Sequence, residues 1–236
     1  MDFISFIVPA HNESFEIGST LDSIFTSARA AGSPFEVIVV NDASTDQTAE
    51  IARIAGAHVL DVNLRKISAV RNAGARQAKG DALFFVDADT RITERVLHAA
   101  LQALSRGAAG GGAGVTFAEP VGRDARLALF FFGILYGRIL NWAAGCFMFA
   151  RKSAFDAAGG FDETLYASEE IVLSMALKRQ GRFVVVGENV VTSSRKLRLR
   201  SVWEFIPFGW RFLRQGPSML RQRSGLDWWY DGKRER

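Results

Sequence analysis

The sequence is poor in cysteine and histidine, with one cysteine, Cys146, and three histidines among 236 residues. A single cysteine cannot form a disulfide within the chain, and no Cys-x-x-Cys or paired His/Cys spacing typical of a zinc site occurs. These absences exclude a disulfide-stapled domain and a zinc module. Scarce cysteine is typical of a reducing compartment, so we expect a cytoplasmic protein, either free or at the inner face of the membrane.

The sequence also lacks an uninterrupted apolar run of the roughly 20 residues that a membrane-spanning helix needs. The most apolar segment, "LALFFFGILYGRILNWAAGCFMFA", is interrupted by Arg138 and Asn141. It predicts a buried or interfacial helix followed by a strand. The opening residues, "MDFISFIVPAHNE", have no basic n-region, so we expect a first strand there and no signal peptide.

Acidic residues are scarce at the C-terminal end, although the formal net charge of the whole chain is only +4. The basic residues after Ser194 are Arg195, Lys196, Arg198, Arg200, Arg211, Arg214, Arg221, Arg223, Lys233, Arg234 and Arg236. Only Glu204, Asp227, Asp231 and Glu235 oppose them. Such a segment suits phosphates, acidic lipid headgroups or nucleic acid. Because no nucleic-acid-binding module surrounds it, we expect no nucleic acid partner.

Aromatic residues lie among these arginines, at Trp203, Phe205, Trp210 and Phe212. Apolar bodies beside cations are expected of an interfacial segment, so residues 197–236 predict peripheral contact with an anionic membrane. The alternative is that these aromatic side chains pack on the preceding domain.

The rest of the chain alternates strand-like and helix-like segments, and 48% of all residues are hydrophobic, enough for a real core. The expected strands are Phe3–Pro9, Phe35–Val40, Ala57–Val62, Ala82–Val86, Cys146–Ala150 and Phe183–Val186, and the expected helices are Glu16–Ala31, Thr48–Ala55, Ser68–Lys79, Thr93–Ser105 and Ser168–Gln180. The glycine-rich stretch Arg106–Val115 is expected to be a connection. The pattern predicts an α/β fold with a mainly parallel sheet flanked by helices.

Polar residues follow three of the expected strands, at Pro9–Glu13, Asn41–Asp46 and Asp87–Asp89. Ligands of parallel α/β sheets gather beyond the carboxyl ends of the strands, so these segments predict a site. Asp87 and Asp89 follow a fully apolar strand, and side chains two apart in extended chain point the same way. A divalent cation would offset their repulsion. The alternatives are solvated turn carboxylates, or caps for the helix beginning near Ile92.

Six segments in order resemble the motifs of the inverting family 2 glycosyltransferases, which have the nucleotide-binding GT-A fold. They are "FIVPAHNE", "VIVVNDASTDQT", "ISAVRNAGARQAKGD", "FFVDADT", "FMFARKSAFDAAGGFDE" and "ASEEIVLSMALKRQG". The resemblance runs from Phe3 to about Arg195. It implies a transferase domain over residues 1–196, with a donor half at 1–110 and an acceptor half at 111–196, followed by a helical basic and aromatic extension at 197–236.

The resemblance implies a binding site for a nucleotide diphosphate sugar. Its donor-binding residues are Pro9, Ala10, His11 and Glu13 around the nucleoside, Asp42 on the base, Arg71 on the diphosphate side, Asp87 and Ala88 near the ribose, and Arg195 at the phosphates. Asp89, with Asp87, would hold Mg²⁺ or Mn²⁺, hard cations that usually share oxygen ligands with substrate phosphates. His11 stands where the family often has an aromatic residue, and Asn41 where many members have aspartate.

Two of these segments also have a purely structural interpretation. Ser44 and Thr45 are good helix caps, and both roles can hold at once. Arg71 taken alone would be a helical surface arginine.

Glu169 and Glu170 match the family's acidic pair, usually Glu-Asp, which carries the catalytic base. The family pattern places the base at the second position, Glu170. The alternative is that a glutamate at a helix start only compensates the helix dipole.

The function implied is metal-dependent sugar transfer to an acceptor hydroxyl with inversion. The Gln-x-x-Arg-Trp motif of processive synthases is absent, so we expect single transfers. The apolar region Val115–Trp142 is expected to shape the acceptor pocket and indicates a lipid-linked acceptor. A nucleotidyltransferase is one alternative, although "PAHNESFEIG" offers no glycine-rich basic loop after the first strand. A nucleotide-sugar-binding protein that has lost catalysis is another.

Overall fold

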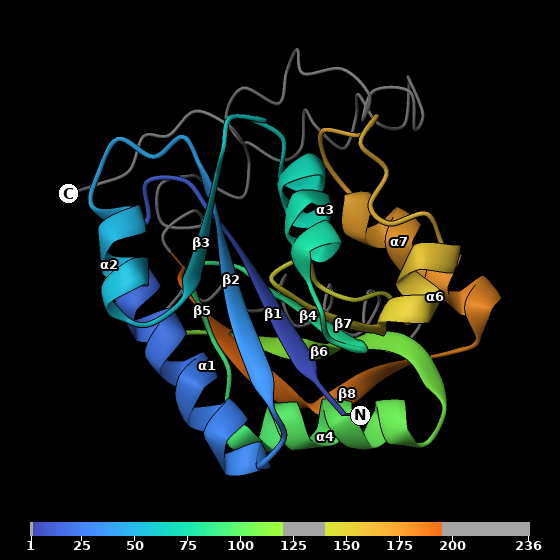
Figure 1. The fold of residues 1–236 in the computed structure, drawn as a ribbon. Helices are drawn as coiled ribbons and strands as arrows, with labels where there is room; N and C mark the ends of the chain where they lie inside the picture. Colours follow the sequence, from blue (N-terminus) through green and yellow to red (C-terminus); the bar gives the residue numbers. More distant parts are fainter. Residues whose placement is uncertain (1, 120–139, 195–236) are drawn as a thin grey trace.

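The computed structural model describes residues 2–119 and 140–194, and its centre is one mixed β-sheet covered by helices on both faces (Figure 1). The strands are β1 (Ile4–Ala10), β2 (Phe35–Asp42), β3 (His58–Val62), β4 (Ala82–Val86), β5 (Thr90–Arg91), β6 (Ala108–Phe117), β7 (Phe147–Arg151) and β8 (Arg182–Thr192). Their order in the sheet is β3-β2-β1-β4-β7-β6-β8-β5. β3, β2, β1 and β4 run parallel, and so do β6 and β8, whereas β7 is antiparallel to both its neighbours and β5 to β8.

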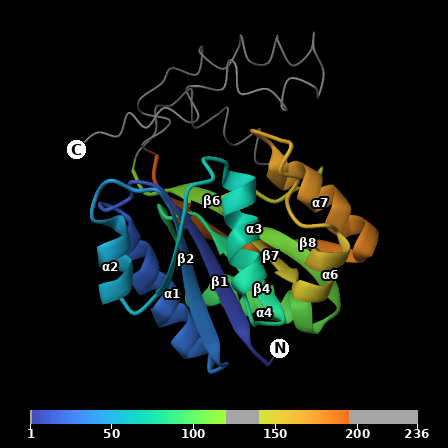
Figure 2. The same cartoon turned by 45° about the horizontal axis from the view of Figure 1, so that its top comes forward.

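The helices form two layers, with α1, α2 and α4 on one face of the sheet and α3, α6 and α7 on the other (Figures 1 and 2). Their bounds are α1 (Ile17–Ala31), α2 (Thr48–Ile54), α3 (Ile67–Gln77), α4 (Glu94–Ser105), α6 (Lys152–Ala157) and α7 (Glu169–Gln180). Each expected helix and strand within the described residues is present, with ends shifted by only a few residues except where β8 continues to Thr192.

Alternation along the strands gives each face its own core. In β4, Phe84 points to the α1 and α4 side and stacks on Phe149 with ring centroids 6.0 Å apart. Its neighbour Phe85 points to the opposite side, where its ring lies 5.2 Å from Phe155 and 5.0 Å from Phe161. The continuous apolar run at Ala82–Val86 follows from this burial on both faces.

The expectation for the glycine-rich stretch was wrong, because Ala108–Phe117 forms β6 in the middle of the sheet. The glycines are required by close approach of backbone on both sides. A Cβ at Gly110 would lie 2.6 Å from the carbonyl oxygen of Phe149, and one at Gly111 would overlap the carbonyl oxygen of Val184. Glycine, usually a strand breaker, is here the residue that lets β7 and β8 pack against β6.

Several expectations lie outside the described residues. These are the apolar helix within 120–139, Arg195, and the basic aromatic extension at 197–236; the division into donor and acceptor halves also stays a prediction. Among the described residues, no helix is long and apolar enough to cross a membrane.

Candidate active site

The three polar segments meet at one edge of the sheet. The carboxyl ends of β1, β2 and β4 reach this edge together, beside the first turns of α3 and α7 (Figures 1 and 2). Parallel pairing of β1 with both β2 and β4 accounts for the meeting, because it aligns their carboxyl ends.

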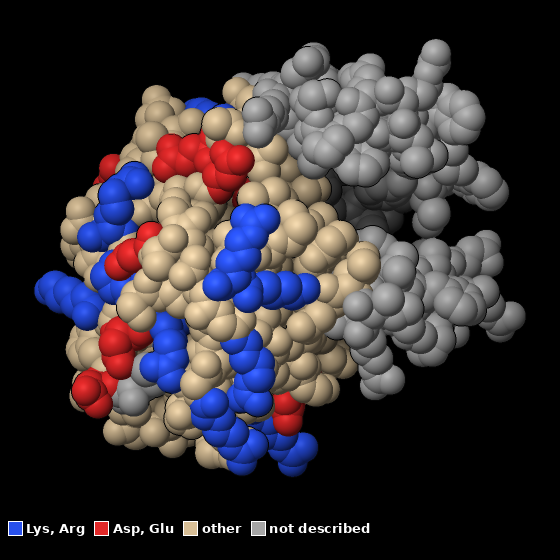
Figure 3. All heavy atoms as spheres, turned by 90° about the vertical axis from the view of Figure 1, so that its right-hand side faces the viewer, with Lys and Arg blue, Asp and Glu red and all other residues tan. Residues whose placement is uncertain are grey.

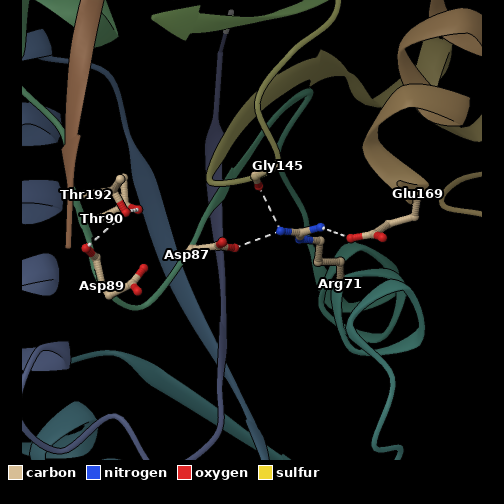
Figure 4. A network of polar contacts seen from close by, with 7 residues as sticks. All are labelled: Arg71, Asp87, Asp89, Thr90, Gly145, Glu169 and Thr192. Atoms are coloured by element: carbon tan, nitrogen blue, oxygen red, sulfur yellow. Dashed lines mark hydrogen bonds and ion pairs between the residues drawn. The ribbon is translucent and has the colours of Figure 1, made fainter. Parts of the chain in front are cut away.

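The acidic loop, Asp87–Asp89, is held in place through its backbone. The bonds that fix it run from Asp87 N to Cys146 O (3.0 Å), from Thr20 Oγ1 to Ala88 O (2.8 Å) and from Ser193 N to Asp89 O (3.1 Å). The chain turns after Val86, with Thr90 N donating to Asp87 O at 3.0 Å. This turn aims the Asp87 carboxylate at Arg71 and places Asp89 beside β8 (Figure 4).

Arg71, on α3, is the buried cation of the site, with 3% of its side chain exposed. Its Nη2 donates to Asp87 Oδ1 at 2.7 Å and to the carbonyl oxygen of Gly145 at 2.8 Å, and its Nη1 donates to Glu169 Oε1 at 2.8 Å (Figure 4). Burial alone would lower the pKa of the guanidinium, but the charges of Asp87 and Glu169 outweigh burial and raise this pKa. The interpretation of Arg71 as a surface arginine is therefore wrong.

The two glutamates at the start of α7 differ in surroundings. Glu169 has 7% of its side chain exposed and is bonded to Arg71. Glu170 is half-buried, and a Cβ at Gly145 would lie 3.7 Å from its carboxyl carbon. The residue before them, Ser168, has a left-handed backbone with φ 62°. Adjacent residues of a helix point in different directions, so one carboxylate is committed to Arg71 and the other lies beside the turn before β7.

On the predicted nucleoside side, Asp42 is bound by the loop that connects β3 to α3. Its two carboxylate oxygens accept from Leu64 N at 2.7 Å and from Arg65 N at 2.9 Å. His11 Nδ1 lies 2.7 Å from Asp42 O, and His11 Nε2 lies 3.3 Å from Arg65 Nη1. Because a guanidinium only donates and a carbonyl oxygen only accepts, these two contacts suit an imidazole that donates through Nδ1 and accepts through Nε2.

The remaining predicted nucleoside residues lie at the end of β1, where Pro9 and Ala10 are its last two residues. Glu13 follows in the next loop, and its amide donates to Thr48 Oγ1 at 2.7 Å. The helix-cap interpretation of Ser44 and Thr45 is wrong, because the residue before α2 is Gln47 and makes no side-chain cap. Ser44 Oγ instead accepts from the Asn12 amide at 2.9 Å.

The acidic loop is not a helix cap either, since Thr93 caps α4 by accepting from Val96 N at 3.3 Å. Within the described residues, no group of three His, Cys, Asp or Glu side chains is arranged to hold a metal ion alone. Two carboxylates on one fixed loop do fit Mg²⁺ or Mn²⁺, which take further oxygens from substrate phosphates and water.

Cys146 lies next to the acidic loop. Burial, together with the negative charges of Asp87 and Asp89, raises the pKa of its thiol, so it stays protonated. Sequence reasoning did not assign Cys146, Gly145, Thr20 or Arg65 to the site. These residues contact the site through backbone groups or from segments distant in sequence, and none of them belongs to a recognisable motif.

Away from this edge, a cavity of about 770 Å³ opens between α3, α6 and α7. Its charged lining residues are Arg76, Lys152, Arg179, Asp156, Asp162 and Glu163. Figure 3 shows the face formed by α6 and α7, where basic side chains lie next to acidic ones. The balance of charge there distinguishes this cavity from the acidic edge.

The sequence profile of glycosyl transferase family 2 matches residues 5–157, which include the acidic loop, Asp42 and Arg71. The chain belongs to this family. The expectation of a family 2 glycosyltransferase, drawn from the six motifs, is thereby confirmed. The profile ends before Glu169 and Glu170, so it leaves their roles untested.

Three similar proteins illustrate the likeness. An undecaprenyl-phosphate 4-deoxy-4-formamido-L-arabinose transferase of Shewanella sediminis is 29% identical over 96 residues, which cover 38% of this chain and 29% of the relative. The chain therefore matches less than a third of that protein's length.

Two solved structures share the fold. The Pyrobaculum calidifontis mannosyltransferase PcManGT, in complex with GDP-Man and Mn²⁺, has a TM-score of 0.66 at 18% identity and covers 94% of this chain and 64% of its own. S. aureus TarS in complex with UDP-GlcNAc has a TM-score of 0.63 at 24% identity, and the superposition covers 83% of this chain and 59% of the TarS chain. The GT-A-type fold is thereby confirmed for this chain, and its sheet is mixed but mostly parallel, as expected.

Proposed function

We propose that this chain transfers single sugars from a nucleotide diphosphate sugar to an acceptor hydroxyl, with inversion and with Mg²⁺ or Mn²⁺. The observation that carries the proposal is the meeting of the acidic loop and the Glu169–Glu170 pair around Arg71. This arrangement puts donor-side and acceptor-side carboxylates at one edge of one sheet. The metal and nucleotide sugars named for PcManGT and TarS are consistent with it.

The donor would lie along the carboxyl ends of β1, β2 and β4. Asp42 keeps acceptor capacity for a base N–H, because each of its oxygens accepts only one backbone bond. Asp89, with the second oxygen of Asp87, would hold the cation. A bound cation would neutralise negative charge on the diphosphate and so make the nucleoside diphosphate a better leaving group.

The acceptor hydroxyl needs a general base, which is typically worth about 10²–10⁴ in rate. Glu169 is bonded to Arg71 and almost fully buried, which favours Glu170 for this role. Glu170 would take the hydroxyl proton while the acceptor oxygen attacks the anomeric carbon from the side opposite the leaving diphosphate. One displacement of this kind inverts the anomeric centre.

Two alternatives have less support. A nucleotidyltransferase needs a glycine-rich basic loop after its first strand, and residues 11–16 here contain neither glycine nor a lysine or arginine. A binding protein without catalysis would not need Glu170 beside the donor edge. The acceptor is a further proposal: the name of the Shewanella relative contains a polyprenyl phosphate, which favours a lipid-linked acceptor for this chain too.

The test is a panel of nucleotide sugars, including UDP-GlcNAc and GDP-mannose, with Mn²⁺ or with chelator. A true donor raises the melting temperature by an amount that grows with the logarithm of the ligand excess over its dissociation constant, and only with metal. The donor so found is then incubated with polyprenyl phosphates, and release of nucleoside diphosphate is measured in the wild type and in Glu170→Gln. Absence of metal-dependent stabilisation by every nucleotide sugar would contradict the proposal.

A further inference from the structure

Arg71 joins four parts of the chain that are far apart in sequence. Besides its own helix, it contacts the acidic loop at Asp87, the turn before β7 at Gly145 and the start of α7 at Glu169, the last 98 positions away. The ring of Phe161 covers the guanidinium, with Arg71 Cζ 5.2 Å from the ring centroid. Within the described residues, this side chain links the donor half to the helix that carries the proposed base.

The hydrogen bonds that Arg71 makes within the protein leave few of its donors for a substrate. Nη1 and Nη2 together donate to two carboxylates and a carbonyl, and Nε is buried without a protein partner. With 3% of the side chain exposed, a diphosphate would have to break these bonds to contact it. The geometry therefore favours an indirect role over direct phosphate binding.

We propose that Arg71 is a positioning residue that couples cation and nucleotide binding at the acidic loop to the first turn of α7. The inference rests on the proposed function. Arg71 fixes which oxygen of Asp87 faces the donor, and it does so while held from the other side by Glu169. A change at Glu169, which lies behind Arg71 as seen from Asp87, therefore reaches the metal-binding loop through one guanidinium (Figure 4).

The sign of the coupling follows from the bond that holds Arg71. The Glu169 carboxylate accepts a charge-assisted hydrogen bond from Arg71, which holds the guanidinium in place against Asp87. In Glu169→Gln that bond is weaker, so Arg71 and the Asp87 carboxylate that it bonds are held less firmly in the binding geometry. The affinity for a divalent cation with a nucleoside diphosphate should fall, by about tenfold if the coupling lies in the usual range for contacting residues.

The experiment is a double-mutant cycle on binding, which needs no acceptor. Calorimetry measures the affinity for UDP and for GDP with saturating Mn²⁺ in the wild type, Glu169→Gln, Arg71→Met and the double variant. The coupling predicts that Glu169→Gln costs about tenfold when Arg71 is present and less than about twofold when it is absent. Arg71→Lys replaces Arg71→Met if the latter shows no cooperative melting, because lysine keeps the charge but cannot bridge two carboxylates in the same geometry.

The matched control is the pair of Arg76, on the same helix α3, and Glu163, in the loop between α6 and α7. Their side-chain atoms lie 3.6 Å apart, and both side chains are largely exposed. Glu163→Gln should leave the affinity unchanged within about twofold, since exposed pairs contribute little. An equal effect of Glu169→Gln with and without Arg71 would overturn the inference and indicate direct contact of Glu169 with the donor. No effect in either background would overturn it as well. If the wild type binds neither nucleotide with Mn²⁺, the proposed function fails, and the inference with it.

Discussion

Asp89 provides the most direct residue-level test of metal use. Its backbone carbonyl accepts from Ser193, and an asparagine would preserve that bond. We expect Asp89→Asn to weaken Mn²⁺-dependent binding of nucleoside diphosphate at least tenfold, while the melting temperature changes by no more than a few degrees. Titration calorimetry with Mn²⁺ and with chelator measures this. Equal wild-type affinity in chelator would show that no cation is needed.

Glu170 and Glu169 should respond differently to the same substitution. Glu170→Gln keeps size and removes basicity, so turnover should fall by about 10²–10⁴ while donor affinity is retained. Glu169→Gln breaks a buried ion pair, so it should lower the melting temperature and reduce turnover less. Single-turnover rates with a confirmed acceptor, set beside melting curves, separate the two. Near-normal turnover in Glu170→Gln would refute its assignment as the base.

The surroundings of Asp46, at the rim of the site, predict that the stability of the fold depends on pH. Burial raises its pKa, but hydrogen bonds from Thr48 and Ser14 outweigh burial and lower the pKa below the ordinary 3.8. A carboxyl whose pKa is lowered by folding stabilises the fold above its unfolded pKa and loses that contribution as pH falls through its folded pKa. Asp46→Ala should thus be less stable than the wild type at pH 7, and the difference should shrink below about pH 4. Denaturant unfolding at both pH values checks this; a constant difference would contradict it.

At the scale of elements, the packing of α3 on the sheet sets where Arg71 lies. Gly74, one turn along the helix, allows this approach, since a Cβ there would lie 2.8 Å from Val40 Cγ2 and overlap Ile7. Gly74→Ala should cost about 1–3 kcal/mol through overpacking, more than the roughly 1 kcal/mol that alanine gains in a helix. The melting temperature should fall by several degrees.

Gly18 in α1 is the matched control for Gly74. A Cβ there meets only Ile51 Cγ2, at an ordinary 3.7 Å, so Gly18→Ala should be neutral or slightly stabilising. Equal melting temperatures for the two alanine variants would show that α3 does not depend on the close approach.

The sequence predicted the elements that local pattern controls and missed those that distant contacts control. The strand at Ala82–Val86 and the helix ending at Ser105 follow from apolar runs and periodicity. The glycine-rich strand β6 could not be predicted, because the reason for its glycines is the backbone of β7 and β8. Likewise, the motif identified Arg71, but its pairing with Glu169 depends on residues 98 positions apart.

At the scale of the whole molecule, the basic aromatic extension at 197–236 predicts salt-sensitive binding to anionic vesicles. The segment lies outside the described residues, so the prediction rests on its composition. Sedimentation of the full chain with anionic vesicles should show binding at low salt that weakens at high salt, and none with neutral vesicles. Absence of any salt-sensitive binding would favour packing of these aromatic side chains on the domain.

Two of the three bonds that hold the acidic loop run between backbone groups, and they have a kinetic consequence. The amides of Asp87 and Ser193 donate to carbonyls of segments far away in sequence, so solvent reaches them only when those segments separate. Deuterium should therefore enter these two amides slowly even without ligand. Adding nucleoside diphosphate and Mn²⁺ should change their exchange rates little, because the loop is already ordered when the donor arrives.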